Sequence, residues 1–382
     1  MRVVWVTHNY PRHAGDVSGA FLHPLAVALR QRDVDVRIVA PSDAGKGGRD
    51  ELDGVPINRV RYGTAAEERL AYRGTMAGAL RSPRSLLVFN RLRAALRAGA
   101  TEELGIGSGA VLVHAHWWVP GGLAAPDSAP LVLTCHGTDV RLLDRVPFAA
   151  VLARPVFRRA RVVTTVSRHL AGAIRHRTGI TIPPDDIQPM PVATVDRPWS
   201  DGSGDVVVVG RLSGQKRVNL ALDAMAIARR SGANLRLTIA GDGPERPALA
   251  RQVLALGLSD AVRFVGEVPP AAIPLLLVTA SCCLMPARRE GFGLAAAEAL
   301  MQGVPVVSCV DGGGLCDIVP AGGSGRIVAP DADAIATAML ELLRDPGARD
   351  AARAEGAQWR ARLSPDFVAD RCLTWYQRAL HA

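Results

Sequence analysis

Lysine is nearly absent from this chain of 382 residues: only Lys46 and Lys216 occur, so arginine supplies nearly all of the positive charge. The formal net charge is +9, and aromatic residues make up only 4% of the chain. The arginines are spread along the chain, whereas nucleic-acid-binding proteins usually gather basic residues into a stripe and interleave stacking aromatics. We therefore expect no nucleic-acid partner, although a positive surface would favour polyanionic small substrates or an anionic bilayer.

Cysteines at metal-binding or redox-active spacings and long apolar runs are also lacking. The six cysteines form no Cys-x-x-Cys pair and no Cys/His zinc spacing, which indicates buried free thiols of a reducing compartment. No apolar run is long enough to cross a bilayer, and the N-terminal apolar stretch is too short for a secretory signal. These features predict a cytoplasmic protein.

Short valine-rich runs alternate with longer helical segments throughout the chain. Apolar runs with little polar alternation are typical of parallel sheets that are covered on both faces, and the helical segments supply the crossovers. The pattern predicts an α/β protein with two doubly wound parallel sheets. The predicted strands are residues 3–7, 34–39, 57–61, 110–115, 131–135, 162–166, 206–209, 235–240, 262–265, 282–285 and 304–308.

A proline-rich stretch separates the two series of strands. Residues 181–205 contain five prolines and a Gly/Ser/Asp patch, which predicts a linker or hinge. We expect one Rossmann-like domain over residues 1–190 and a second over 200–364. A last helix over 365–382 is expected to pack back on the first domain, with Phe367, Cys372, Trp375 and Tyr376 as anchors. Ligands of open parallel sheets bind at the carboxyl ends of strands, so two facing sheets predict an interdomain cleft.

The strongest functional signal is Glu290-Gly291-Phe292-Gly293-Leu294, followed by Glu298. It comes after a predicted strand and opens a helix, whose free N–H groups and positive dipole end suit a phosphate. Carboxylates on either side could accept hydrogen bonds from hydroxyls of a sugar and a ribose. A solvated turn with a surface glutamate on the helix is the other interpretation of this stretch alone.

A second motif, Gly210-Arg211-Leu212 followed by Lys216, lies where the first strand of the second domain ends. A guanidinium and an ammonium five residues apart suit a diphosphate. Surface ion pairing is the alternative. The next turn, 240–244 (AGDGP), is expected to have a structural role, because its glycines permit tight backbone geometry.

Taken in order, these motifs resemble family 4 glycosyltransferases of the GT-B fold, the group 1 type. The resemblance covers essentially the whole chain. In the first domain it includes Gly19 in the loop after the first strand, the turn at 134–139 (TCHGTD) and 163–167. In the second it includes GRL…K, AGDGP, FVGEV at 264–268, EGFGLAAAEAL at 290–300, GVPVV at 303–307 and the glycine pair after it.

The resemblance implies a retaining transfer of a sugar from a nucleotide diphosphate to a small-molecule, glycan or lipid-linked acceptor. The residues that it implies as catalytic are His136, Arg211, Lys216 and Glu290. The residues that it implies for donor binding are Gly19, Val265, Gly266, Val268, Gly291, Phe292, Gly293, Leu294 and Glu298. It implies no cofactor and no metal, and we expect Asp33-Val34-Asp35 and Asp331-Ala332-Asp333 to be a strand start and a helix cap. Two departures are Arg217, where the family usually has glycine, and Asp317, where it commonly has glutamate.

The acceptor side is less specific. His116, Trp117 and Trp118 end a predicted strand and could stack on an acceptor ring, with core packing as the alternative for the tryptophans. The arginine-rich segment 69–97 could press on an anionic membrane as an interfacial helix, which would make the protein peripheral at the inner membrane face. A core-facing helix with a solvated arginine face is the other interpretation. A nucleotide-sugar-binding protein without turnover and a sugar-nucleotide epimerase remain as alternative functions, and the sequence predicts no oligomeric state.

Overall fold

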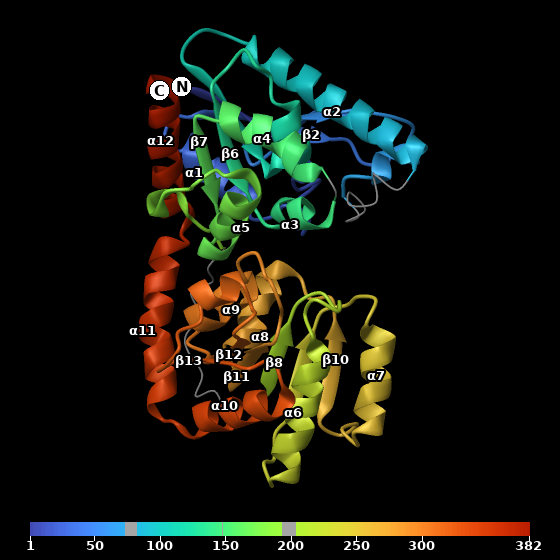
Figure 1. Cartoon of the computed structure of the whole chain (residues 1–382), viewed down its shortest axis with the longest axis vertical. Helices are drawn as coiled ribbons and strands as arrows, with labels where there is room; N and C mark the ends of the chain where they lie inside the picture. Colours follow the sequence, from blue (N-terminus) through green and yellow to red (C-terminus); the bar gives the residue numbers. More distant parts are fainter. Residues whose placement is uncertain (73–81, 147, 193–203) are drawn as a thin grey trace. The chain divides into compact units, whose positions relative to one another are not determined.

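The computed structural model describes residues 1–72, 82–146, 148–192 and 204–382 (Figure 1). Two compact units make up the chain. Unit 1 comprises Met1–Pro191 and Pro365–Ala382, and unit 2 comprises Val192–Ser364. Of the predicted linker, residues 193–203 lie outside the described part.

Unit 1 is built on a seven-stranded sheet with the order β3-β4-β2-β1-β5-β6-β7. All neighbouring strands are parallel except β3 and β4. β3 was not predicted from the sequence, since it lies at the sheet edge and its residues GRDEL are mostly exposed. The strands are β1 (Arg2–Val6), β2 (Asp35–Pro41), β3 (Gly48–Leu52), β4 (Val55–Val60), β5 (Val111–His116), β6 (Leu131–Cys135) and β7 (Val162–Thr165).

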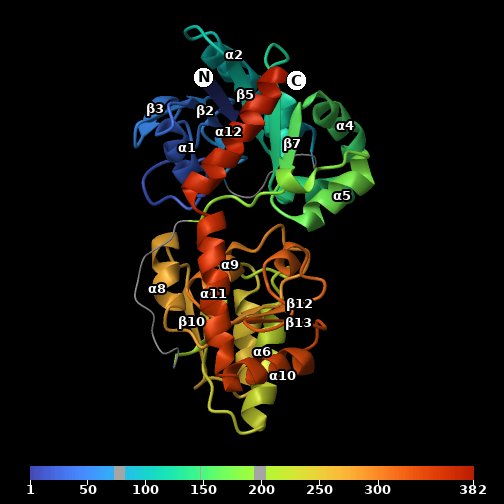
Figure 2. The same cartoon turned by 90° about the vertical axis from the view of Figure 1, so that its left-hand side faces the viewer.

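Helices cover both faces of this sheet, as the apolar strands require. α1 and α12 lie side by side on one face, and α2 packs on strands of the same sheet from the other (Figure 2). The helices of unit 1 are α1 (Leu22–Arg30), α2 (Pro83–Leu104), α3 (Thr138–Arg145), α4 (Ala149–Arg159), α5 (Arg168–Thr178) and α12 (Pro365–His381).

Unit 2 has a six-stranded parallel sheet with the order β10-β9-β8-β11-β12-β13. Its strands are β8 (Val206–Val209), β9 (Leu237–Ala240), β10 (Val262–Gly266), β11 (Cys282–Met285), β12 (Val306–Cys309) and β13 (Gly325–Val328). Its helices are α6 (Val218–Arg230), α7 (Arg246–Ala255), α8 (Ile273–Leu277), α9 (Leu294–Met301), α10 (Ala332–Arg344) and α11 (Gly347–Arg362). α6 packs against α10, and α9 packs against α11.

The C-terminal helix α12 is held in unit 1 by aromatic side chains and hydrogen bonds. Trp375 and Tyr376 are fully buried, as is Cys372. The Tyr376 hydroxyl accepts a hydrogen bond from the Trp5 indole (3.2 Å) and lies 2.9 Å from Nδ1 of His114. Phe367, the fourth predicted anchor, is instead 41% exposed.

Helix α2 occupies the arginine-rich segment from residue 83 onward; residues 73–81 lie outside the described part. Its apolar residues Val88, Phe89, Leu92 and Leu96 are buried. These four residues face the core, as the core-facing interpretation expects, whereas Leu86 and Leu87 of the same helix are exposed (42% and 51%). Membrane contact of this segment stays a prediction.

Glycine at position 356 is required by the close approach of α11 to α9. A Cβ atom there would lie 2.0 Å from the carbonyl oxygen of Leu300. Backbone cannot move away as a flexible side chain can, so an added methyl group forces the two helices apart.

We therefore expect Gly356→Ala to lower the free energy of unfolding by about 1–3 kcal/mol, although alanine favours helices. The matched control is Gly172→Ala in α5, where an added Cβ meets nothing within 4 Å; it should raise the free energy of unfolding by about 0.5–1 kcal/mol. Denaturant titration of both variants measures this. A Gly356→Ala protein as stable as the parent would show that the helices do not approach so closely.

Candidate functional site

Lys216 and Glu290, two of the residues predicted to hold a nucleotide sugar, come together in unit 2 where strand order reverses. β8 lies between β9 and β11, and ligands of such sheets bind at the carboxyl ends of strands at this point. The loop after β8 carries Lys216, and the loop after β11 carries Glu290. Their side chains form an ion pair of 2.9 Å between Nζ and Oε2, with 22% and 18% of the side chains exposed. The amide of Gln215 also lies 3.4 Å from the same carboxylate oxygen.

The glycines after β12 hold Glu290 in place through the backbone. Glu290 pairs with Gly313: its N–H donates to Gly312 O (2.9 Å), and its carbonyl accepts from Gly314 N (2.8 Å). A Cβ atom on Gly314 would lie 2.2 Å from the carbonyl oxygen of Gly291. The glycine run therefore lets two loops meet directly, which fixes the direction of the Glu290 side chain.

Arg217, the departure from the family's usual glycine, has a left-handed backbone (φ 49°) that glycine would adopt without strain. Its guanidinium donates to the carbonyl of Pro286 (2.7 Å) and to both carboxylate oxygens of Asp311 (2.5 and 3.0 Å). Arg217 thus ties the loop that carries Lys216 to the loops after β11 and β12. These contacts offset the backbone strain and brace the Lys216–Glu290 pair.

The amino end of α9 is open. Its N-cap, Gly293, has φ 108° and no side chain to accept from the first turn, which leaves backbone N–H groups for a ligand. Phe292 is buried and meets the Trp359 ring edge-on at 6.2 Å between centroids. Leu294 is partly exposed. The turn is thus anchored by one aromatic residue, and Gly291 and Gly293 are buried beside it.

Glu298 lies in α9, one helical turn further on. Burial raises the pKa of its carboxyl to about 7. A carboxyl with this pKa changes charge near neutral pH, so its capacity to accept hydrogen bonds from hydroxyls depends on pH.

The remaining predicted residues of unit 2 lie at the carboxyl ends of β8 and β10. Arg211 follows β8 with an exposed side chain. Val265 and Gly266 end β10, and Val268 follows in the next loop. The AGDGP turn has the structural role that was predicted: a Cβ on Gly241 would lie 2.0 Å from Gly210 O, and one on Gly243 would lie 2.3 Å from Leu212 O.

In unit 1 the predicted residues lie at the carboxyl ends of β1, β5 and β6. Gly19 follows β1 and precedes α1; its φ is 68°, and a Cβ there would lie 2.4 Å from Asn9 O. His136 follows β6. Its Nε2 lies 3.1 Å from Nδ1 of His116, and its ring centroid lies 4.4 Å from that of Trp117. Burial lowers the pKa of both histidines well below the ordinary value, so both are neutral at pH 7.

Asp139 organises this turn and was not singled out from the sequence. It is 1% exposed, and its carboxylate accepts hydrogen bonds from the backbone N–H groups of His136, Gly137 and Trp118 (3.2, 2.9 and 3.1 Å). Burial raises the pKa of Asp139 above its ordinary value, although the hydrogen bonds from Gly137 and Trp118 act in the opposite direction. The only sequence signal was its place after the His-Gly-Thr turn.

The three residues predicted for the acceptor side are buried. Trp118 donates its indole N–H to the carbonyl of Asp139 (2.8 Å), and His116 lies between His114 and His136. Trp117 contacts His8 and His136 edge-on or tilted. All three help to shape the turn around His136, and their contact with an acceptor stays a prediction.

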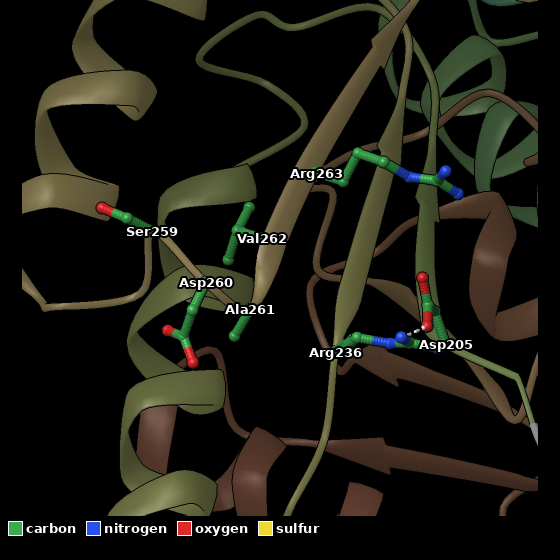
Figure 3. A pocket seen from close by; sticks show the side chains of 7 residues that line it. All are labelled: Asp205, Arg236, Ser259, Asp260, Ala261, Val262 and Arg263. Carbon is green, nitrogen blue, oxygen red and sulfur yellow. Dashed lines mark hydrogen bonds and ion pairs between the residues drawn. The ribbon is translucent and has the colours of Figure 1, made fainter.

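A hollow at the opposite edge of the unit 2 sheet is a different feature. It is lined by residues at the amino ends of β8, β9 and β10, including an Asp205–Arg236 ion pair of 2.9 Å (Figure 3). Because ligands of parallel sheets bind at the carboxyl ends, we do not assign the donor to it.

Two further predictions concern metals and membranes. Asp35 begins β2 and Asp331 caps α10 by accepting from Ala334 N (2.9 Å), as was expected of the two Asp-x-Asp strings. In the part of the chain that the structure describes, no group of three or more His, Cys, Asp or Glu side chains could hold a metal ion. No helix among the described residues is long and apolar enough to cross a membrane.

Comparison of the sequence with known proteins identifies the family to which this arrangement of residues belongs. Residues 18–191 match the family described as Glycosyltransferase Family 4, and residues 195–359 match Glycosyl transferases group 1. Glycogen synthase of Mycobacterium tuberculosis is 29% identical over 96% of this chain and 91% of its own. The 2-deoxystreptamine glucosyltransferase of Streptomyces kanamyceticus is 29% identical over 68% of this chain and 74% of its own.

Solved structures agree on the fold. Sucrose-phosphate synthase of Thermosynechococcus elongatus superposes with a TM-score of 0.74, at 20% identity, over 99% of each chain. Anabaena HepE in complex with UDP and glucose superposes with a TM-score of 0.69, at 19% identity, over 98% of each chain. Both family matches together span nearly the whole chain. It therefore belongs to the group 1 glycosyltransferases of family 4, and it is a glycosyltransferase with the GT-B fold.

Proposed function

We propose that this enzyme transfers a sugar from a nucleotide diphosphate to a hydroxyl of a small-molecule, glycan or lipid-linked acceptor, with retention of configuration and without a metal. The observation that carries the proposal is the pairing of Lys216 with Glu290 beside the open amino end of α9. This arrangement brings a cation, a carboxylate and free N–H groups to one end of one sheet.

In this proposal the positive groups bind the diphosphate. Lys216, Arg211 and the first-turn N–H groups of α9 neutralise the charge that develops as the nucleotide diphosphate leaves. They take the part that a divalent cation plays in other transferases. Gly19, in the loop after β1, is assigned to donor binding through its backbone N–H group.

The carboxylates bind hydroxyl groups. Glu290 accepts from the sugar that is transferred, and the hydrogen bond from the ammonium of Lys216 orients this carboxylate. Glu298 accepts from the ribose, and the ends of β10 (Val265, Gly266 and Val268) frame the base. Anabaena HepE, a protein with the same fold, was solved in complex with UDP and glucose, which supports a nucleotide donor here.

His136 is assigned to the reacting face as a neutral side chain. Its low pKa makes it a weak base, so it does not remove the acceptor's proton efficiently. We propose that the leaving phosphate accepts this proton on the face from which it departs. The enzyme then contributes positioning and charge stabilisation.

Lys216→Ala and Glu290→Ala are each expected to lower kcat/KM by about two to four orders of magnitude, because they remove charge stabilisation and sugar orientation. The donor for the assay is the one that gives the largest thermal shift among UDP-, GDP-, ADP- and dTDP-sugars. The control is Arg229→Ala, which breaks the surface ion pair with Asp260 in the same unit (2.8 Å) and should change kcat/KM less than about twofold. A loss below tenfold would remove the substituted residue from the site.

Glu298 predicts a pH dependence of donor binding. With a pKa of about 7, roughly one-tenth of Glu298 is ionised at pH 6 and roughly nine-tenths at pH 8. Only the ionised form accepts from both ribose hydroxyls, so the Kd of the donor should fall about tenfold from pH 6 to pH 8. Calorimetric titration measures it. Glu298→Gln should bind weakly at both pH values with the same Kd, and a parent Kd that does not change would contradict this role.

Metal independence is tested by the rate of transfer, and retention of configuration is tested on the product. In excess EDTA the rate should stay within about twofold of the rate with added Mg²⁺ or Mn²⁺, because protein cations neutralise the diphosphate. Proton NMR of the product should show the anomeric configuration of the donor. Loss of activity in EDTA that Mn²⁺ restores, or the opposite anomer, would refute the respective part of the proposal.

A further inference from the structure

The net positive charge, arginines and lysines minus carboxylates, is concentrated in one segment of the chain. Residues 138–178, which form α3, α4, β7 and α5, contain nine arginines and two aspartates, a formal excess of seven out of the chain's nine. Of the two aspartates, Asp139 is buried and Asp144 is paired with Arg177 (2.6 Å). Arg159 also pairs with Asp127, which lies outside this segment. Even with this pair, arginines outnumber carboxylates on these helices.

Helix α4 combines this charge with exposed apolar side chains. It lies with α5 on the outside of unit 1, beyond β7 (Figure 2). Ala149, Ala153, Val156 and Phe157 face the domain and are buried. On the opposite side, Phe148 is 80% exposed, and Val151 and Leu152 are each 59% exposed. Val151, Leu152 and the exposed Pro155 lie on one face of α4, and Phe148, the N-cap residue before the helix, continues their spacing of i, i+3, i+4, i+7.

Arginines flank the stripe. The side chains of Arg145 and Arg158 are exposed, and neither forms an ion pair or a hydrogen bond with another described residue. Arg154 is exposed as well and donates only to a backbone carbonyl, that of Arg177, at 3.5 Å. α4 itself contains no acidic residue. Exposed apolar side chains bordered by unpaired guanidinium groups match the boundary between acyl chains and anionic headgroups.

We propose that the surface formed by Phe148, Val151, Leu152 and Pro155, with Arg145, Arg154 and Arg158 around it, binds anionic lipid bilayers. The apolar stripe enters the headgroup boundary, and the arginines bind lipid phosphates. A second copy of the chain fits less well, because two such surfaces would bring like charges together. Moreover, a stable protein interface uses roughly 20–30 residues on each side.

The test uses the full chain in co-sedimentation with vesicles of pure phosphatidylcholine or of phosphatidylcholine with 30% phosphatidylglycerol, without donor or acceptor. We expect binding to the anionic vesicles only, weakened by salt. The triple variant Phe148→Ser, Val151→Ser and Leu152→Ser should bind at least tenfold more weakly. All three side chains are largely exposed, so circular dichroism and melting temperature should match the parent.

The matched control is Leu86→Ser with Leu87→Ser, because these leucines are also exposed (42% and 51%) but lie on α2. This variant should bind vesicles as the parent does. The proposal is overturned if the parent binds neither vesicle, if the triple variant binds like the parent, or if lipid-free sedimentation shows a dimer that only the triple variant abolishes. None of these outcomes bears on sugar transfer, which is assayed with soluble acceptors.

Discussion

An ion pair between Lys216 and Glu290, 2.9 Å long, lies where the strand order of unit 2 reverses, and the proposed chemistry depends on it. A carboxylate beside a phosphate site would repel the ligand, and the ammonium offsets this repulsion. The same ammonium orients the carboxylate for hydrogen bonds. One pair thus makes it feasible for a single site to accept both a diphosphate and sugar hydroxyls.

The surrounding backbone maintains this pair. Glycines 312–314 allow the loop after β12 to pair with Glu290, and Gly241 allows the loop after β9 to approach Gly210. Arg217 adds a side-chain brace where glycine would give only conformational freedom, since its guanidinium joins Pro286 and Asp311. In unit 1 a buried carboxylate, Asp139, does the equivalent work for the turn that carries His136.

Much of this could be predicted from residue patterns, for physical reasons. Buried parallel strands need apolar runs such as Val206–Val209, and the Lys216 and Glu290 motifs follow such runs directly. Two of the four edge strands were not predicted: β3 is polar and exposed, and β13 begins with Gly325 and Arg326 and is only partly buried. The role of Asp139 could not be predicted, because one of its hydrogen-bond donors, Trp118, lies in another loop. The ion pair between Arg217 and Asp311 could not be predicted either, because the two residues are far apart in the sequence and Arg217 has a left-handed backbone. Phe367 was assigned to the core by its type, yet it faces outward.

The surface of α4 shows a separate constraint. Apolar residues on both sides of one helix serve two environments, the domain core and, in our proposal, a bilayer. The central claim about catalysis is tested most directly by a crystal structure of the enzyme with its nucleotide sugar. We predict the diphosphate within hydrogen-bonding distance of Lys216 Nζ and the N–H groups of Leu294 or Ala295, with Glu290 on the sugar. A nucleotide bound elsewhere, with Glu290 free of the sugar, would contradict the account.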